Sequence, residues 1–181
     1  MKEVRFSFGI ISSYEFFYKL LQEYKDFDKY YPSARHAINC AITSWHLTDW
    51  TFNEFYIDDP KYQDEEKTRI RKGKKQVIKI SGIGKYQNQM IKKCPELKYM
   101  RLIANGNKHC ILRNSDIIEK TVIYKGDYNY DYSRHDYDVD KFEIVLKKNK
   151  KIDFEETLCK TIKFWRVYIS HNIYKNKGKN K

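Results

Sequence analysis

The chain has 181 residues, a formal net charge of +12 and a sequence pI of about 9.4. This length predicts one domain with its own hydrophobic core, and a content of 16 tyrosines, 10 phenylalanines and 3 tryptophans predicts that the core is aromatic. The low number of glycines and prolines excludes a loop-rich all-β fold. The positive charge favours a polyanionic partner, of which nucleic acid and an anionic membrane surface are the common kinds.

No segment of the sequence has the pattern of a signal peptide or a membrane span. Residues 1–5 are charged and no apolar run follows them, and no stretch approaches the roughly 18 apolar residues that a spanning helix needs. The cysteines lack CxxC spacing and zinc-ligand spacing, which predicts buried thiols in a reducing compartment. They are Cys40, Cys94, Cys110 and Cys159. We therefore expect a cytoplasmic protein that does not associate with membranes.

The first third of the chain predicts two helices. After a short extended segment at 4–11, Ser12 or Ser13 followed by Glu15 is a typical helix start, because a serine hydroxyl accepts a hydrogen bond from a free amide of the first turn. Aromatic and leucine residues at helical spacing carry this first helix to about Asp28.

The second helix is predicted over 32–56, with Pro32 in its first turn. An apolar stripe runs beside a stripe of small polar groups, which is typical of the central helix of a bundle rather than of a surface helix. Asp49 falls in the apolar stripe, where a carboxylate must find a hydrogen-bond donor or become neutral.

The centre of the chain is strongly charged and then returns to a helical pattern. The segment 63–75 is predicted as a short exposed helix, 76–80 as a strand and 81–84 as a turn. A third helix follows over about 85–108 and is restarted at Pro95. Gly106 either ends this helix or weakens it by about 1 kcal/mol relative to alanine.

Two β-rich segments precede the last helix. Residues 116–124 and 142–146 are rich in β-branched and aromatic residues, and 147–151 is turn-like. The Asp-rich and Tyr-rich segment 126–140 is read as a polar hairpin loop, the alternative being a cation-binding or base-stacking loop. Residues 155–174 predict an amphipathic helix.

We therefore expect a mainly α fold, a helical bundle of four main helices with a small β-hairpin inserted before the C-terminal helix. Residues 1–174 are expected to form a single domain, and 175–181 a disordered basic tail.

One candidate site lies on the third predicted helix. Arg101, Asn105, Lys108 and His109 are offset by four, seven and eight residues, which places them on one helix face. Arginine grips phosphate oxygens in a fork geometry, lysine adds charge and histidine moves a proton near neutral pH, so this set suits a phosphodiester. The alternative is a structural helix end, with Arg101 paired to a carboxylate and Asn105 acting as a cap.

A second candidate set is His46 and Asp49 in "SWHLTDW", three residues apart and therefore neighbours on one helix. An aspartate beside a histidine can fix its tautomer or join it on a metal ion. The alternative is a buried histidine with a satisfied hydrogen bond.

The densest positive charge lies between residues 67 and 75. Within this run we assign phosphate contact to Arg71, Lys72, Lys74 and Lys75, with a solvated loop as the alternative.

The stretches "NCAITSWHLTDWTFNEF" and "CPELKYMRLIANGNKHC" together resemble a set of uncharacterised bacterial helical proteins with WHxxDW and RxxANxxKH motifs. More distantly, an arginine-to-histidine helix in a small bundle is similar to HEPN-type domains, often dimeric, metal-independent ribonucleases of toxin, RNA-processing and phage-defence systems. That family separates the two residues by four to six positions, which Arg166 and His171 match, whereas Arg101 and His109 have seven residues between them.

The resemblance implies an RNA-directed ribonuclease, with a homodimer as its assembly and no metal or other cofactor. His109 would act as general acid or base, Arg101 would stabilise the charge of the transition state, and Lys108 and Asn105 would orient the phosphate. The alternative is a non-catalytic module that binds nucleic acid or a protein partner from the same operon, in which the WHxxDW and KH motifs are structural. A hydrolase with a metal held by His46, Asp49 and His109 is the third hypothesis.

Overall fold

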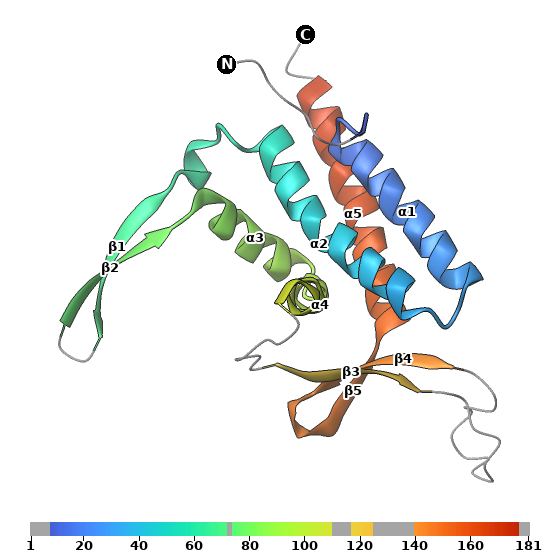
Figure 1. Cartoon of the computed structure of the whole chain (residues 1–181). Coiled ribbons are helices and arrows are strands. Elements are labelled where there is room, and N and C mark those ends of the chain that lie inside the picture. The colour runs from blue at the N-terminus through green and yellow to red at the C-terminus, as the bar shows by residue number, and fades with distance from the viewer. Residues whose placement is uncertain (1–7, 72–73, 110–116, 125–139, 178–181) are drawn as a thin grey trace.

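The computed structural model describes residues 8–71, 74–109, 117–124 and 140–177 of the chain. This part is mainly helical, as the sequence predicted, and it also contains two small antiparallel sheets (Figure 1). The helices are α1 Ser13–Lys29, α2 Ala34–Phe55, α3 Gly82–Lys93, α4 Leu97–His109 and α5 Phe154–Lys177. The strands are β1 Glu65–Arg71, β2 Lys74–Ile80, β3 Ile118–Tyr124, β4 Lys141–Leu146 and β5 Lys150–Asp153.

The described residues form five α-helices, where the sequence predicted four main ones. The predicted third helix is in fact two helices, α3 and α4, and Pro95 is the reason. Cys94 before it has extended backbone, with φ −137° and ψ 92°, because proline disfavours helical geometry in the preceding residue. Gly106 lies inside α4, so it does not end that helix.

Helix α1 begins where the sequence predicted. The Ser12 hydroxyl accepts a hydrogen bond from the Glu15 amide at 3.2 Å, and the Glu15 carboxylate accepts one from the Ser12 amide at 3.1 Å. This reciprocal capping box satisfies two amides that the helix itself leaves without partners.

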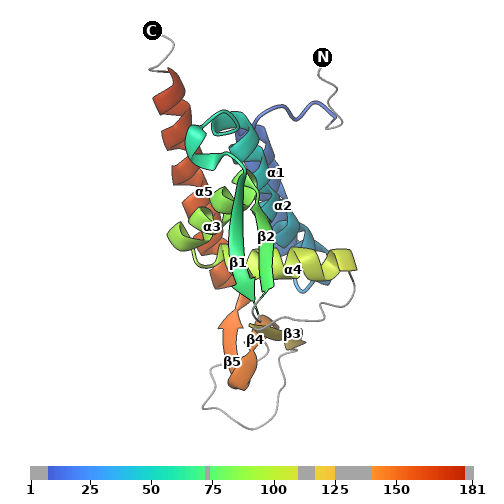
Figure 2. The same ribbon diagram turned by 90° about the vertical axis from the view of Figure 1, so that its left-hand side faces the viewer.

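Helix α2 is the central helix of the bundle, as predicted, although most of its predicted polar stripe is exposed. It contacts α1, α3, α4 and α5, and Figures 1 and 2 show it among them. Lys19 of α1 donates to Thr43 Oγ1 at 2.8 Å, and Trp165 of α5 donates from its indole nitrogen to the Ser44 carbonyl at 3.0 Å. The small polar side chains of α2 thus let neighbouring helices approach and bond to it.

An aromatic cluster joins α1 to the second sheet and to α5, as expected for an aromatic core. The fully buried Phe27 ring lies 5.2 Å from Tyr31, 5.3 Å from Phe142 and 5.8 Å from Phe154, measured between ring centroids. All three pairs are edge-on, the arrangement that aromatic quadrupoles favour.

A chain of buried or half-buried polar groups, here called the tyrosine network, connects α2, α3 and α5. Its members are Thr51, Tyr56, Tyr86, Tyr168 and Asn172. The Tyr86 hydroxyl lies 2.8 Å from Thr51 Oγ1 and 3.2 Å from the Tyr168 hydroxyl. Tyr168 continues to Tyr56 at 3.1 Å, and Tyr56 donates to Asn172 at 2.5 Å. Burial raises the pKa of both Tyr86 and Tyr168, so these phenols stay neutral at a pH of about 10, where an exposed tyrosine begins to ionise.

The charged centre of the chain is a β-hairpin, here called the arm, in which β1 pairs with β2. The arm projects away from the helices (Figure 1) and points toward the viewer in Figure 2. The predicted strand at 76–80 is confirmed, but the predicted exposed helix at 63–75 is wrong. A single short charged helix has little stability of its own, whereas two strands satisfy each other's backbone groups. The predicted turn at 81–84 is also wrong, because Ser81 caps α3 and Gly84 lies in its first turn.

The second sheet has the order β3-β4-β5 and lies at one end of the helices. The two predicted strands are confirmed. The turn-like segment 147–151 contains a 3-10 turn at Lys147–Asn149 and the first residues of β5, so the predicted hairpin is a three-stranded sheet. The Asp-rich and Tyr-rich loop lies outside the described residues except for Asp140.

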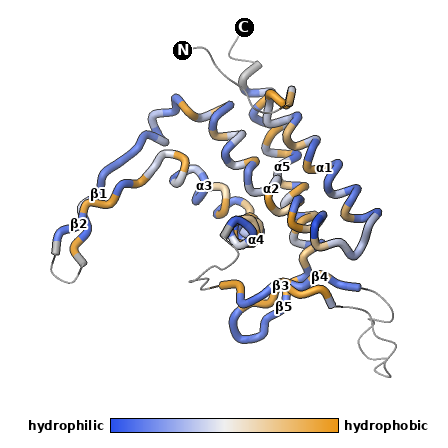
Figure 3. Tube along the Cα trace, in the orientation of Figure 1, coloured by the Kyte–Doolittle hydropathy of each residue, from blue (hydrophilic) through white to orange (hydrophobic). Residues whose placement is uncertain are grey.

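Helix α5 runs three residues beyond the predicted end, to Lys177. Hydrophilic and hydrophobic positions alternate along the helices, whereas most of strand β1 is hydrophilic (Figure 3). Within the described ranges, no helix combines the length and the apolar character needed to cross a bilayer.

Candidate nucleic-acid interface

The arm carries most of the charge excess in the centre of the chain. Residues 65–80 contain seven lysines or arginines against two glutamates, a net charge of +5. Every side chain of the arm that the structure describes is exposed, except Ile80, which is half-buried. The arm therefore presents its charge to solvent rather than to the core.

The ion pairs divide the arm into a neutralised base and a positive outer part. Near the base, Lys67 lies 3.4 Å from Glu65, and Lys79 lies 3.5 Å from Glu66. Farther out, Arg69 and Lys75 have no ion pair with any carboxylate in the described part of the chain. The free charge of the arm thus increases toward its tip.

Strand register sorts the arm's side chains onto two faces. Arg69 is opposite Gln76 and Lys67 is opposite Ile78, and because alternate residues of a strand share one side, these four form one face, here called the reading face. On the other face Thr68 is opposite Val77 and Ile70 is opposite Lys75. Ile70 and Val77 are 69% and 63% exposed, and Ile78 on the reading face is 38% exposed.

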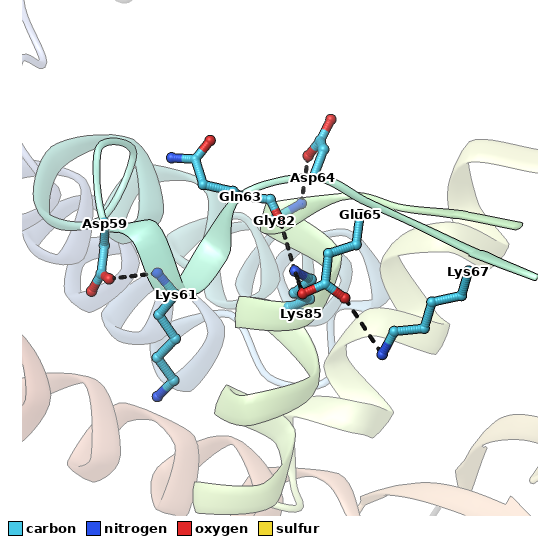
Figure 4. Close-up of polar contacts among 8 residues, drawn as sticks. All are labelled: Asp59, Lys61, Gln63, Asp64, Glu65, Lys67, Gly82 and Lys85. Atoms are coloured by element: carbon cyan, nitrogen blue, oxygen red, sulfur yellow. Dashed lines mark hydrogen bonds and ion pairs between the residues drawn. The ribbon is translucent and has the colours of Figure 1, made fainter.

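The base of the arm is fixed to α3 by a set of charged hydrogen bonds (Figure 4). The Lys85 ammonium lies 2.5 Å from a Glu65 carboxylate oxygen and donates to the Gln63 carbonyl at 2.6 Å. The hydrogen bond from Lys85 lowers the pKa of Glu65. The Gly82 amide donates to Asp64 Oδ1 at 2.7 Å. These contacts set the direction in which both strands leave the body.

Gly82 is required at this junction for steric reasons. A Cβ atom built on Gly82 would lie 1.6 Å from the Tyr62 carbonyl oxygen, which is far inside van der Waals contact. The neighbouring turn at Pro60–Tyr62 is capped by Asp59, whose carboxylate accepts from the Lys61 amide at 2.9 Å.

The four predicted phosphate-binding residues all belong to the arm or its tip. Lys75 lies exposed on β2. The backbones of Arg71 and Lys74 pair across the two strands. Their side chains lie outside the part of the chain that the structure describes. Lys72 lies outside the described residues. Sequence reasoning did not single out Gln76 and Ile78, because only the hairpin register shows that they share a face with Arg69.

Helices α2 and α4, which carry the two candidate catalytic sets, pack against each other. The Arg101 guanidinium lies 5.7 Å from the centre of the Trp45 ring, next to His46 in the chain. It forms no ion pair with a described carboxylate, contrary to the pairing considered for a structural helix end. Asn105 is half-buried and Lys108 is exposed, whereas the side chain of His109 is outside the description.

His46 and Asp49 do not bond to each other. His46 is exposed, and the half-buried Asp49 accepts a hydrogen bond from Gln87 of α3 at 3.0 Å. Burial raises the pKa of Asp49, against the smaller lowering effects of the nearby His46 and of the Gln87 bond. Gln87 is thus the donor that a carboxylate in an apolar stripe requires.

The remaining candidate pair on α5 forms no hydrogen bond or ion pair between its two members. Arg166 and His171 are both exposed on α5. In the described part of the chain, no three histidine, cysteine, aspartate or glutamate side chains lie together as metal ligands. Cys40 and Cys94 are buried free thiols and Cys159 is a half-buried one, while Cys110 lies outside the described residues.

Comparisons with known protein families, with curated protein sequences and with solved structures each found no match to this chain.

Proposed function

We propose that this protein binds nucleic acid and that the arm supplies its phosphate contacts. The observation that carries the proposal is the net charge of +5 on a hairpin whose described side chains are almost all exposed. A lysine or arginine on such a surface gains little from intramolecular ion pairing, whereas each phosphate contact releases condensed counterions.

Arg69 and Lys75 are the residues with which to test this proposal, because both are exposed and neither has an ion pair among the described residues. The variant Arg69→Gln/Lys75→Gln removes two charges without leaving a carboxylate unpaired. Lys25→Gln/Lys163→Gln removes two exposed charges from α1 and α5 and is the matched control.

We expect the arm variant to bind nucleic acid at least tenfold more weakly at low salt, measured by fluorescence anisotropy. The slope of log affinity against log salt should become shallower by about 0.9 for each of these two side chains that contacts a phosphate. The control should keep both the affinity and the slope. Equal weakening of both variants would show a diffuse charge effect and would overturn the assignment to the arm.

A second proposal is a HEPN-like, metal-independent ribonuclease of the toxin or phage-defence kind. It is supported by the packing of α4 on α2, with the Arg101 guanidinium over Trp45 beside His46. In this reaction His109 would move the proton of the attacking 2'-hydroxyl and Arg101 would stabilise the transferred charge. His46 and Asp49 would lie beside the reacting phosphodiester and add to the charge around it. Asn105 and Lys108 would orient the phosphate.

The ribonuclease is tested by incubating labelled RNA with the protein in the presence of a chelator. Cleavage is expected with the native sequence and should be lost in Arg101→Ala/His109→Ala. An unchanged melting temperature and unchanged RNA binding of that variant would show that chemistry alone was removed. RNA that is bound but left intact by the native protein would refute the ribonuclease and leave nucleic-acid binding standing.

A further inference from the structure

We infer that the arm docks in the major groove of B-form duplex DNA, with its reading face toward the base pairs. This inference rests on the proposed nucleic-acid binding and names the class of nucleic acid. It is drawn from the shape of the arm, the side chains that strand register places on one face, and the anchor at its base.

The dimensions of the arm fit a major groove. Each strand has seven residues, which span roughly 24 Å at about 3.4 Å per residue. The groove of B-form DNA is about 12 Å wide and 8.5 Å deep, which admits a two-stranded ribbon. The arm meets a further requirement, since beyond its base its described side chains are exposed on both faces.

The reading face has the chemistry for base edges. Arg69 and Gln76 are directly opposite each other, and cross-strand partners have Cβ atoms about 5 Å apart. Arginine bonds in bidentate fashion to O6 and N7 of guanine, and glutamine to N6 and N7 of adenine. Neither side chain has a partner in the described part of the chain. The pair can therefore read neighbouring base pairs.

The remaining side chains of the arm have matching roles. Ile78, on the reading face, suits the methyl group of thymine, which projects into the major groove. Lys75 lies on the opposite face, toward the mouth of the groove, from where its long side chain reaches a flanking phosphate. The contacts of Lys85 and Gly82 hold the arm's base in place, which reduces the ordering cost of docking.

The same shape excludes duplex RNA as the preferred partner. The major groove of A-form RNA is deep and narrow, so side chains cannot read it. Electrostatic attraction alone would hold RNA and DNA by their phosphates with similar strength. A clear preference for duplex DNA is therefore the signature of groove docking.

The first experiment measures binding to a DNA duplex and an RNA duplex of matched sequence, each of about 20 base pairs or two helical turns. We expect the native protein to bind the DNA duplex at least tenfold more tightly than the RNA duplex. The variant Arg69→Gln/Lys75→Gln should lose this preference. Equal binding to DNA and RNA that is weakened by this variant would overturn groove docking but not the proposed function. Binding unchanged by the variant would overturn both.

The second experiment separates base reading from charge. Arg69→Lys keeps the charge but loses the bidentate fork. Binding sites are selected from a randomised duplex pool with the native protein and with this variant. The native protein should select a guanine at one position, and the preference of the variant for that guanine should be weaker by roughly five- to hundredfold. The salt dependence of the affinity for an arbitrary duplex should be the same for both proteins. No selected base, or the same preference in both proteins, would overturn the inference.

Discussion

The helical body and the arm place their polar side chains in opposite environments. In the body, tyrosines and threonines are buried and bond to one another across three helices, as in the tyrosine network. In the arm, polar and charged side chains are exposed, and those of Arg69, Lys75 and Gln76 have no partner among the described residues. The side chains of the body therefore contribute to stability, whereas those of the arm are available for the contacts proposed above. Stability and binding can therefore be tested by separate substitutions.

The largest contrast is expected between apolar residues of the two regions. Phe27→Ala should cost about 3 to 5 kcal/mol of unfolding free energy, because it removes a fully buried ring from the aromatic cluster. Ile70→Ala in the arm, at a side chain that is 69% exposed, should change it by no more than about 0.5 kcal/mol. Urea unfolding measures both. A comparable loss for Ile70→Ala would show that the arm packs on the body or on a second chain.

The next effect tests the junction between the regions. Gly82→Ala should destabilise the protein by about 2 kcal/mol, because the new methyl group would meet the Tyr62 carbonyl and displace the base of the arm. Gly84→Ala is the matched control in the same helical turn, where the nearest atom is the Ser81 hydroxyl oxygen at 3.0 Å. Because alanine favours helices over glycine, the control should be neutral or slightly stabilising in thermal unfolding. Equal melting temperatures for the two variants would contradict the anchoring role of Gly82.

A smaller effect is expected in the tyrosine network. Tyr86→Phe removes the hydroxyl that lies between Thr51 and Tyr168 and should cost about 0.5 to 1.5 kcal/mol, because both partners keep another hydrogen bond. Tyr18→Phe, at a side chain that is 56% exposed, is the control and should cost almost nothing.

The network also gives a pH dependence with a definite sign. Burial raises the pKa of Tyr86 and Tyr168 in the folded protein, whereas in the unfolded chain a phenol loses its proton near pH 10. Above about pH 10 the folded state therefore holds more protons, and stability should fall as pH rises. In Tyr86→Phe this fall should be smaller. An identical pH profile for the variant would assign the loss to other groups.

The smallest effect concerns Asp49, whose pKa is raised chiefly by burial. The stability that a raised carboxyl pKa contributes is present below the unfolded value of about 3.9 and is lost as pH rises through the folded value. Asp49→Asn should therefore be neutral or stabilising by about 0.5 kcal/mol at pH 7, and less so at pH 4. Asp58→Asn, at an exposed residue, controls for the charge change. A large loss at pH 7 would mean that the carboxylate itself is needed.

Much of the body could be predicted because its determinants are local. Helical spacing of apolar residues, the capping box at Ser12 and the break at Pro95 all lie within a few positions along the chain. The error in counting helices came from treating Pro95 as a restart of one helix. The hypothesis that placed His46 and Asp49 in one site with His109 required their two helices to meet, and α2 and α4 do pack together.

Contacts between residues far apart in sequence could not be predicted, because they depend on how helices and strands pack. Asp49 meets Gln87, 38 positions away, and no periodicity in α2 announces that donor. The basic run becomes a ribbon with two distinct faces only through the pairing of β1 with β2, because register determines which side chains share a side. The charge excess, the aromatic core and the start of α1 follow from composition and local patterns. The position of the charge on a projecting arm depends instead on the contacts of Gly82 and Lys85 with residues 63–65.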